Sequence, residues 1–322
     1  MFYIKDLQYK MYNSMSTIHR LRIFTDFCSS TEAMTSAKRV WGEPLSGWEL
    51  VDDESYTHAI LMNTPMVLHN IPKENVLGLA MEPFIGFLDK PHPFLNLTPE
   101  FIQYANQYIG NYFLSSPFFE STTKKMPEPF KARFSFLWHM PVLPKDYIPA
   151  TIQSGKPLFS MMVSHKRFAP GHEYRHKLIT TLLRIPNFPI HIYGNGCEDY
   201  SHDRRVRGVF DDDITLYQEY PFNICIENFQ LPHYFSEKLI NPLLCATTPV
   251  YLGCIQIDEY FPKHGDFHGI MKLTGTVDTD LRLLYKIIKN PEEYRKKHTP
   301  CREKVRETTS LMRNLDILFP QS

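Results

Sequence analysis

The sequence has no excess of charge of either sign, because 35 Lys and Arg residues balance 35 Asp and Glu residues. This balance gives no global attraction to nucleic acid or anionic membranes, although a local basic cleft is compatible with it. No hydrophobic run approaches the ~18 residues of a membrane span. The N-terminal stretch MFYIKDLQYKMYNSM also lacks the continuous apolar core of a signal peptide. We therefore expect a cytoplasmic protein with no transmembrane segment and no nucleic-acid partner.

Cysteine is scarce, and its six positions show no CxxC spacing. This pattern favours reduced thiols over a zinc site or a disulfide framework. Gly194-Asn195-Gly196 is only part of a GxGxxG motif, so it does not indicate a dinucleotide site. What is present is ordinary for a soluble globular protein, with 43% apolar and 22% charged residues.

Short apolar runs alternate with helical patterns in both halves of the chain. The predicted strands cover residues 20–27, 57–63, 75–81, 107–114, 157–164, 188–194, 222–228, 248–253 and 269–275, and helices are predicted at 31–41, 99–107, 173–185, after 236 and from 277 to 318. Strands that alternate with helices indicate parallel sheets. The proline-rich stretch 139–157 excludes regular structure, so we place a boundary there. The sequence thus predicts two α/β domains of Rossmann-like type that face a cleft, at 1–148 and 149–322.

The stretch CIENFQLPHYFSEKLINPLLCATTPVYLGC (225–254) places polar groups between an apolar strand and a helix that begins near Ser236. In parallel sheets, ligands bind beyond the carboxyl ends of strands, where helix N-termini favour phosphate. Lys238 adds a positive charge and Tyr234 a phenolic donor, while Glu237 is suited to sugar hydroxyls. The combination fits a nucleoside diphosphate that carries a ribose. A helix with an ordinary polar first turn and a surface lysine explains the residues equally well.

This stretch resembles the donor-binding signature of the alpha-1,3-fucosyltransferases, glycosyltransferase family 10. The matching segments are CIEN, HYFSEKLINPLL and TTPVYLG, together with SHKRFAPGHEYRHKL (164–178) and YGNGC…RRVRGVF (193–210). The resemblance covers residues 157–275 well and the N-terminal half weakly. Because the chain shows no membrane anchor and no disulfide pattern, it looks more like the soluble bacterial or viral members.

The resemblance implies a GT-B fold and an inverting transfer of fucose from GDP-fucose to an oligosaccharide or glycoconjugate acceptor, with an alpha-1,3 type linkage. It implies no obligatory cofactor, and a divalent metal is compatible but not required. Carried over to this sequence, the resemblance implies that Arg175 and Lys238 neutralise the diphosphate and that Tyr234 forms a hydrogen bond to it. It also implies that Glu237 binds donor hydroxyls, that Asn228 lines the nucleotide pocket and that Glu227 orients the loop.

An inverting transferase also needs a general base on the face of the sugar opposite the leaving group. Glu82 follows an apolar strand and precedes Pro83, which places it at a strand's carboxyl end facing the cleft. The base glutamate of the family lies in a comparable place, so Glu82 is the predicted catalytic residue. An exposed loop carboxylate is the alternative interpretation. Glu74 and Glu100 are weaker candidates, since they lie in turns flanked by lysine or proline.

Three other patterns leave alternatives open. His172 and His176 have the i,i+4 spacing of a metal-binding pair, but no HExxH motif accompanies them, so a solvated or phosphate-adjacent role is favoured. Asp211-Asp212-Asp213 contains the D-x-D pattern of metal-dependent transferases, but the favoured interpretation is that Asp213 caps the following helix. The basic run Arg204, Arg205 and Arg207 is typical of a solvated loop, although it is also within reach of a nucleotide. For the whole protein, the alternatives are a transferase of the same fold that uses another nucleotide sugar, and a catalytically silent sugar-nucleotide or glycan-binding protein.

Overall fold

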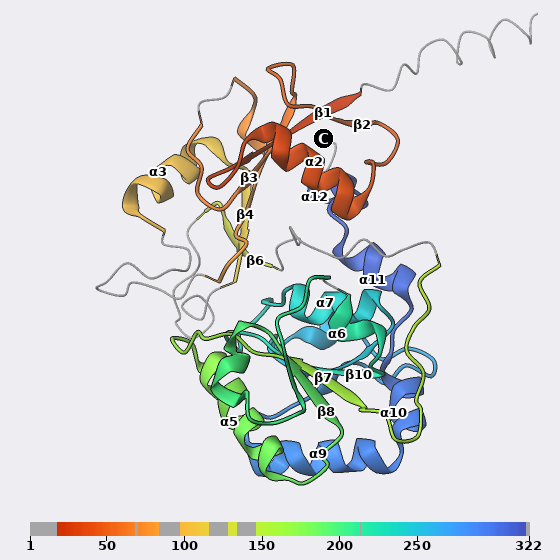
Figure 1. Cartoon of the computed structure of the whole chain (residues 1–322). Coiled ribbons are helices and arrows are strands. Elements are labelled where there is room, and N and C mark those ends of the chain that lie inside the picture. Colours follow the sequence, from red (N-terminus) through yellow and green to blue (C-terminus); the bar gives the residue numbers. More distant parts are fainter. Residues whose placement is uncertain are drawn as a thin grey trace, which may run out of the picture.

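The computed structural model describes residues 18–67, 70–83, 97–115, 128–133, 146–212 and 214–319. Two parallel sheets of six strands each form the centres of two domains, which lie one above the other in Figure 1. Every strand pair in both sheets is parallel, as the alternation of strands and helices predicts. This arrangement confirms the predicted two-domain α/β fold.

The first sheet has the strand order β2-β1-β3-β4-β5-β6. Its strands are β1 (His19–Thr25), β2 (Trp48–Leu50), β3 (His58–Met62), β4 (Val76–Leu79), β5 (Asn111–Leu114) and β6 (Phe130–Ala132). The helices of this domain are α2 (Ser30–Trp41), the short 3-10 helix η1 (Lys73–Asn75) and α3 (Pro99–Tyr108). The central strands β3 and β4 are buried along their whole length, which is the pattern of parallel strands covered on both faces.

The second sheet has the order β12-β11-β10-β7-β8-β9. Its strands are β7 (Phe159–Met162), β8 (Ile190–Tyr193), β9 (Val206–Gly208), β10 (Phe222–Ile226), β11 (Thr248–Leu252) and β12 (Met271–Lys272). The helices between these strands are α5 (Pro170–Arg184), the 3-10 helix η2 (Asn195–Tyr200), α6 (Thr215–Gln218), α7 (Glu237–Leu244) and α8 (Ile257–Tyr260). The central strand β10 is buried throughout, and its carboxyl end leads directly to Glu227.

The C-terminal helices connect the two domains. After α9 (Val277–Lys289) and α10 (Pro291–His298), α11 (Arg302–Thr309) packs near α7, and α12 (Leu315–Leu318) lies against the first domain beside the C-terminus in Figure 1. One hydrophobic cluster includes Leu21 of β1, Leu239 of α7 and Leu315 of α12. The apolar core is therefore continuous from the second domain into the first. The domain boundary at residue 148 stays a prediction.

Helices of the described ranges are all too short or too polar to cross a bilayer. All six cysteines are free thiols, and four of them are buried.

Candidate active site

Glu227 fixes the beginning of α7. This carboxylate is buried directly after β10, and it accepts hydrogen bonds from the backbone nitrogen of Ser236 (2.8 Å) and from the Ser236 hydroxyl (2.7 Å). Ser236 in turn is the N-cap of α7, since its hydroxyl accepts from the backbone nitrogen of Lys238. Burial raises the pKa of Glu227, while Lys238 and the Ser236 donors oppose that shift. The side chain of Glu227 thus connects the end of β10 to the beginning of α7.

Arg175 of α5 lies on the other side of the same loop. Its guanidinium is 5% exposed and donates to the carbonyl oxygen of Ile226 (2.6 Å from Nη2) and to Oδ1 of Asn228 (2.8 Å). Burial lowers the pKa of Arg175, which the surrounding carboxylates counteract. Part of its donor capacity therefore positions the loop after β10.

Helix α5 begins in direct contact with this loop. The backbone nitrogen of Gly171 donates to the carbonyl of Asn228 at 3.0 Å, and a Cβ atom at position 171 would collide with the carbonyl oxygen of Glu227. Only glycine permits this approach of two backbones. The contact brings the first turn of α5, and with it Arg175, to the carboxyl end of β10.

Glu237 and Lys238 form an ion pair in the first turn of α7, with 2.7 Å between Lys238 Nζ and Glu237 Oε1. Burial by itself would lower the pKa of Lys238, but the carboxylates of Glu237 and Glu227 raise it above its ordinary value. Burial likewise disfavours the charged form of Glu237, yet Lys238 holds the pKa of Glu237 below its ordinary value. Both side chains therefore stay charged at neutral pH.

The remaining predicted donor residue, Tyr234, is 6% exposed. Burial raises its pKa well above the ordinary value, and the carboxylates of Glu227, Glu82 and Glu237 act in the same direction. Tyr234 consequently remains a protonated hydrogen-bond donor among three carboxylates.

Glu82 reaches this cluster from the first domain. It lies just beyond the carboxyl end of β4, and its carboxyl interacts electrostatically with Lys238, Glu237 and Glu227 of the second domain. Although the residue as a whole is exposed, partial desolvation of the carboxyl raises its pKa to about 7, with Lys238 opposing the shift. The predicted base and the predicted donor residues therefore come together from opposite domains.

Residues just beyond the carboxyl ends of β3 and β1 position the chain before Glu82. Asn63, which follows β3 and has a φ of 62°, accepts a hydrogen bond at Oδ1 from the backbone nitrogen of Met81 (3.1 Å). Its Nδ2 donates to Asp26, beyond the end of β1. Farther along the same edge, the Ser115 hydroxyl after β5 donates to the carbonyl of Pro232 in the second domain. The carboxyl ends of the two sheets therefore face each other.

The sequence favoured a solvated or phosphate-adjacent role for His172 and did not indicate Lys166 as part of the site. His172 of α5 is 2% exposed, its Nδ1 has no hydrogen-bond partner, and its neighbours include Arg175 and Asn228. Burial, followed by Arg175, Lys166 and Lys238, lowers the pKa of His172 to about 4, so it is neutral at physiological pH. Its spacing from His176 suggested a metal pair, whereas His176 binds Tyr200 and the Ser164 carbonyl. The useful signal would have been its place in the first turn of the helix after β7.

One of the other sequence patterns, the basic run, lies away from this cluster. Arg204 and Arg205 precede β9, at the amino end of the second sheet, and Asp213 lies outside the described residues. Asp212 accepts at Oδ1 from the backbone nitrogen of Ile214. In the part of the chain that the structure describes, no group of three or more His, Cys, Asp or Glu side chains is placed to hold a metal ion.

Comparison with known proteins yields one family and one fold. The family described as "Glycosyltransferase family 10 (fucosyltransferase) C-term" matches residues 152–314, which include every candidate donor residue. A protein of Acanthamoeba polyphaga mimivirus, R654, which is named as a fucosyltransferase, is 33% identical over 99 residues. That alignment covers 28% of this chain and 16% of the viral protein, so the chain matches only a small part of its relative.

Solved structures of similar fold cover nearly the whole chain. An alpha1,3-fucosyltransferase with GDP has a TM-score of 0.51 at 11% identity and covers 94% of this chain and 92% of its own. Anabaena Alr3699/HepE in complex with UDP-glucose also has a TM-score of 0.51, at 10% identity, and covers 93% and 98% of the two chains. At this identity the likeness establishes the GT-B fold alone.

Proposed function

Since the chain belongs to glycosyltransferase family 10, the fucosyltransferase family, we propose that it transfers fucose from GDP-fucose to a hydroxyl of a glycan acceptor, with inversion at the anomeric carbon. One observation carries the proposal: Glu82 of the first domain lies in the electrostatic field of Lys238, Glu237 and Glu227 of the second. In the proposal, Glu82 is the base and Lys238 the phosphate-binding cation, and their electrostatic interaction supports a reaction between the two domains.

The donor half of the proposal places the diphosphate at the amino end of α7. There the helix dipole favours an anion, while the backbone N–H groups of Ser236 and Lys238 already have partners. Lys238 and Arg175 supply the positive charge that stabilises GDP as it leaves, and Tyr234 supplies a hydrogen bond. Glu237 accepts hydrogen bonds from fucose hydroxyls, Asn228 lines the nucleotide pocket, and Glu227 orients the loop. These groups can neutralise the diphosphate without a metal ion.

The acceptor half assigns the proton transfer to Glu82. Its carboxylate takes the proton of the acceptor hydroxyl, whose oxygen forms a bond to the anomeric carbon while the bond from that carbon to the GDP oxygen breaks. The electron pair of the broken bond stays on GDP. A pKa of about 7 suits this role, because a base near neutrality is both deprotonated often enough and strong enough to accept the proton. We propose an alpha-1,3 type linkage.

Thermal stabilisation by GDP, GDP-fucose, GDP-mannose, UDP and UDP-glucose, measured side by side, tests the donor. A ligand at a hundredfold excess over its Kd adds about 2.7 kcal/mol to the free energy of unfolding. We expect GDP and GDP-fucose to raise the melting temperature and the UDP compounds to leave it unchanged. Stabilisation by UDP compounds alone would replace fucose by another sugar. Stabilisation by GDP-fucose with no release of GDP, across an array of glycan acceptors, would favour a silent binding protein.

A further inference from the structure

A large cavity lies at the opposite end of the second sheet from the candidate active site. It has a volume of about 810 Å³ and is lined by residues at the amino ends of three strands: Leu158 before β7, Ile190 at the start of β8 and Arg205 before β9. Ligand sites in proteins are commonly of this size. Because the candidate active-site residues follow the carboxyl ends of the strands, the length of the strands separates the two places.

The lining of this cavity is unusually rich in one charge. Its 16 described lining residues include four cationic ones, Lys156, Arg204, Arg205 and Arg207, and none that is acidic. The whole chain, in contrast, contains equal numbers of basic and acidic residues. The positive charge is therefore concentrated here rather than spread evenly.

Three of these cations are available to a ligand. Arg205 is already satisfied, since it donates to Asp203 and to the carbonyls of Leu183 and Ile185 at the end of α5. Lys156, Arg204 and Arg207 are exposed, and within the described residues none of them forms an ion pair. Exposed arginines present a planar fork that matches phosphate, sulfate and carboxylate groups.

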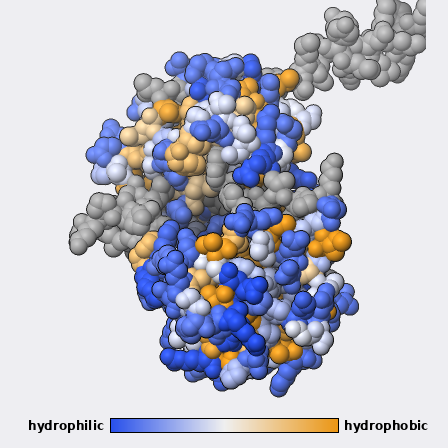
Figure 2. Space-filling model, in the orientation of Figure 1, coloured by the Kyte–Doolittle hydropathy of each residue, from blue (hydrophilic) through white to orange (hydrophobic). Residues whose placement is uncertain are grey.

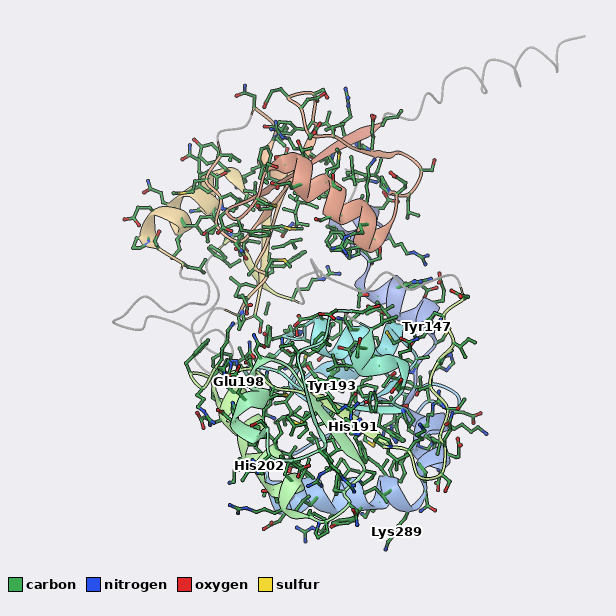
Figure 3. The ribbon with its side chains drawn as sticks, in the orientation of Figure 1. Tyr147, His191, Tyr193, Glu198, His202 and Lys289 are labelled. Atoms are coloured by element: carbon green, nitrogen blue, oxygen red, sulfur yellow. The ribbon has the colours of Figure 1, made fainter. Side chains whose placement is uncertain are left out.

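The cavity continues at both ends into smaller ones, which makes it a groove. One neighbouring cavity shares Lys156, His191 and Arg207 with it and reaches Glu219, and another shares Arg204 and Arg205 and reaches His202. His191 and His202, both labelled in Figure 3, thus mark two parts of the groove. The cations are distributed along the groove and do not converge on one point. This arrangement fits a chain with repeated anionic groups better than a single small anion.

The walls of the groove indicate what kind of chain it fits. Between the cations lie amide and hydroxyl groups of Gln153, Ser154 and Asn187, and the apolar surfaces of Pro157 and Pro189. Such a mixture suits the hydroxyl groups and C–H faces of sugars. On the face of the second domain that Figure 2 shows, hydrophilic and hydrophobic residues lie close together.

Two alternative ligands fit less well. An added peptide strand would need an open sheet edge, but the edge strand β9 has only three residues and its register with β8 is irregular. Single-stranded nucleic acid needs exposed aromatic rings for stacking, whereas the aromatic ring of the lining, Phe188, is 3% exposed. We therefore propose that this groove, which we call the basic groove and define by Lys156, Arg204 and Arg207, binds a polyanionic glycan chain independently of the donor site.

The test measures binding of a fluorescein-labelled sulfated hexasaccharide to the full chain by fluorescence anisotropy, with and without GDP at saturation. The groove variant combines Lys156→Gln, Arg204→Gln and Arg207→Gln. The control variant combines Arg39→Gln, Lys73→Gln and Lys263→Gln, which removes the same charge from exposed positions elsewhere. Melting temperature and GDP binding show whether each variant is folded.

We expect the groove variant to bind the hexasaccharide roughly tenfold more weakly than the wild type, and the control variant to change its affinity by less than about twofold. Affinity should also fall as the salt concentration rises. Equal weakening in both variants would mean a non-specific charge effect and would overturn the proposal. Competition between GDP and the hexasaccharide would place the binding in the donor site, and tighter binding of a hexaglutamate peptide would make the groove a protein-docking surface; either result also overturns it.

Discussion

The indole nitrogen of Trp48 donates a hydrogen bond of 2.7 Å to Asp316, a residue 268 positions later in the chain. The same indole contacts the ring of Phe319, with 5.5 Å between ring centroids, and Phe319 also contacts His58. The last helix of the chain is thereby attached to the first sheet, although the preceding helix α11 packs in the second domain. Stability of the two domains should therefore be coupled.

This coupling can be measured with Trp48→Phe, which keeps the aromatic contact and removes the hydrogen-bond donor. Loss of a hydrogen bond to a charged group costs about 1.5–3 kcal/mol. We expect the free energy of unfolding, from urea titration, to fall by that amount. In a double-mutant cycle with Asp316→Asn, the two effects should be non-additive. Additive effects would mean that the bond contributes nothing to stability.

Replacement of Glu82 tests the proposed base. Glu82→Gln should lower kcat by about 10²–10⁴-fold, the usual contribution of a general base, and leave the Kd of GDP within about twofold of the wild type. Unchanged turnover would remove Glu82 from the reaction. Glu74→Gln provides a matched control, because this carboxylate lies in the first turn of η1 and was a weaker candidate.

The pH dependence of the wild type should report the same group. Because the base must be deprotonated, kcat/KM should rise with pH and level off above a pKa of about 7. Folding raises this pKa from 4.5, so the folded state favours the protonated form, and stability is lost as the pH rises through about 7. The melting temperature of Glu82→Gln, relative to the wild type, should accordingly increase between these two pH values. If the difference in melting temperature between the variant and the wild type does not change with pH, the pKa of Glu82 is not raised.

Lys238→Ala should weaken GDP binding by about 1.5–3 kcal/mol, which corresponds to roughly 10–150-fold in Kd. Isothermal titration calorimetry measures this directly. Lys272→Ala is the matched control, since Lys272 of the same domain forms a comparable pair with Asp258, at 2.8 Å, outside the site. If both variants bind GDP like the wild type, the diphosphate lies elsewhere.

Glu227→Gln should destabilise the protein by about 1.5–3 kcal/mol, because a neutral amide cannot accept both Ser236 hydrogen bonds as strongly as a carboxylate. Urea unfolding measures the change. Glu259→Gln, at an exposed position, should alter stability by no more than about 0.5 kcal/mol. A loss of GDP binding without any loss of stability would instead assign Glu227 a direct contact with the donor.

The central strands could be predicted from sequence because they are long apolar runs, such as residues 57–63 for β3 and 222–228 for β10. The strands β2, β6 and β9 were missed. Each has three residues and lies at the edge of its sheet, where fewer positions are buried and the apolar pattern is too short to recognise.

The part of the site that could be predicted from the sequence consists of residues that come directly after a strand. Glu82 and Glu227 each come directly after an apolar run, so parallel topology predicts each of them at the carboxyl end of its own sheet. The contact of Arg175 with the Ile226 carbonyl was not predictable, because it depends on how closely α5 approaches β10 at Gly171. The environment of His172 depends on the same approach, and no local sequence pattern encodes it.

The chain passes between the two sheets twice, once from β6 to β7 and once from α11 to α12. The second passage ends at the hydrogen bond between Trp48 and Asp316 and at the contact of Phe319 with His58. In chain order, the second domain therefore lies between two attachments to the first domain, so Glu82 and Lys238 belong to domains that the chain joins at both ends of the second one.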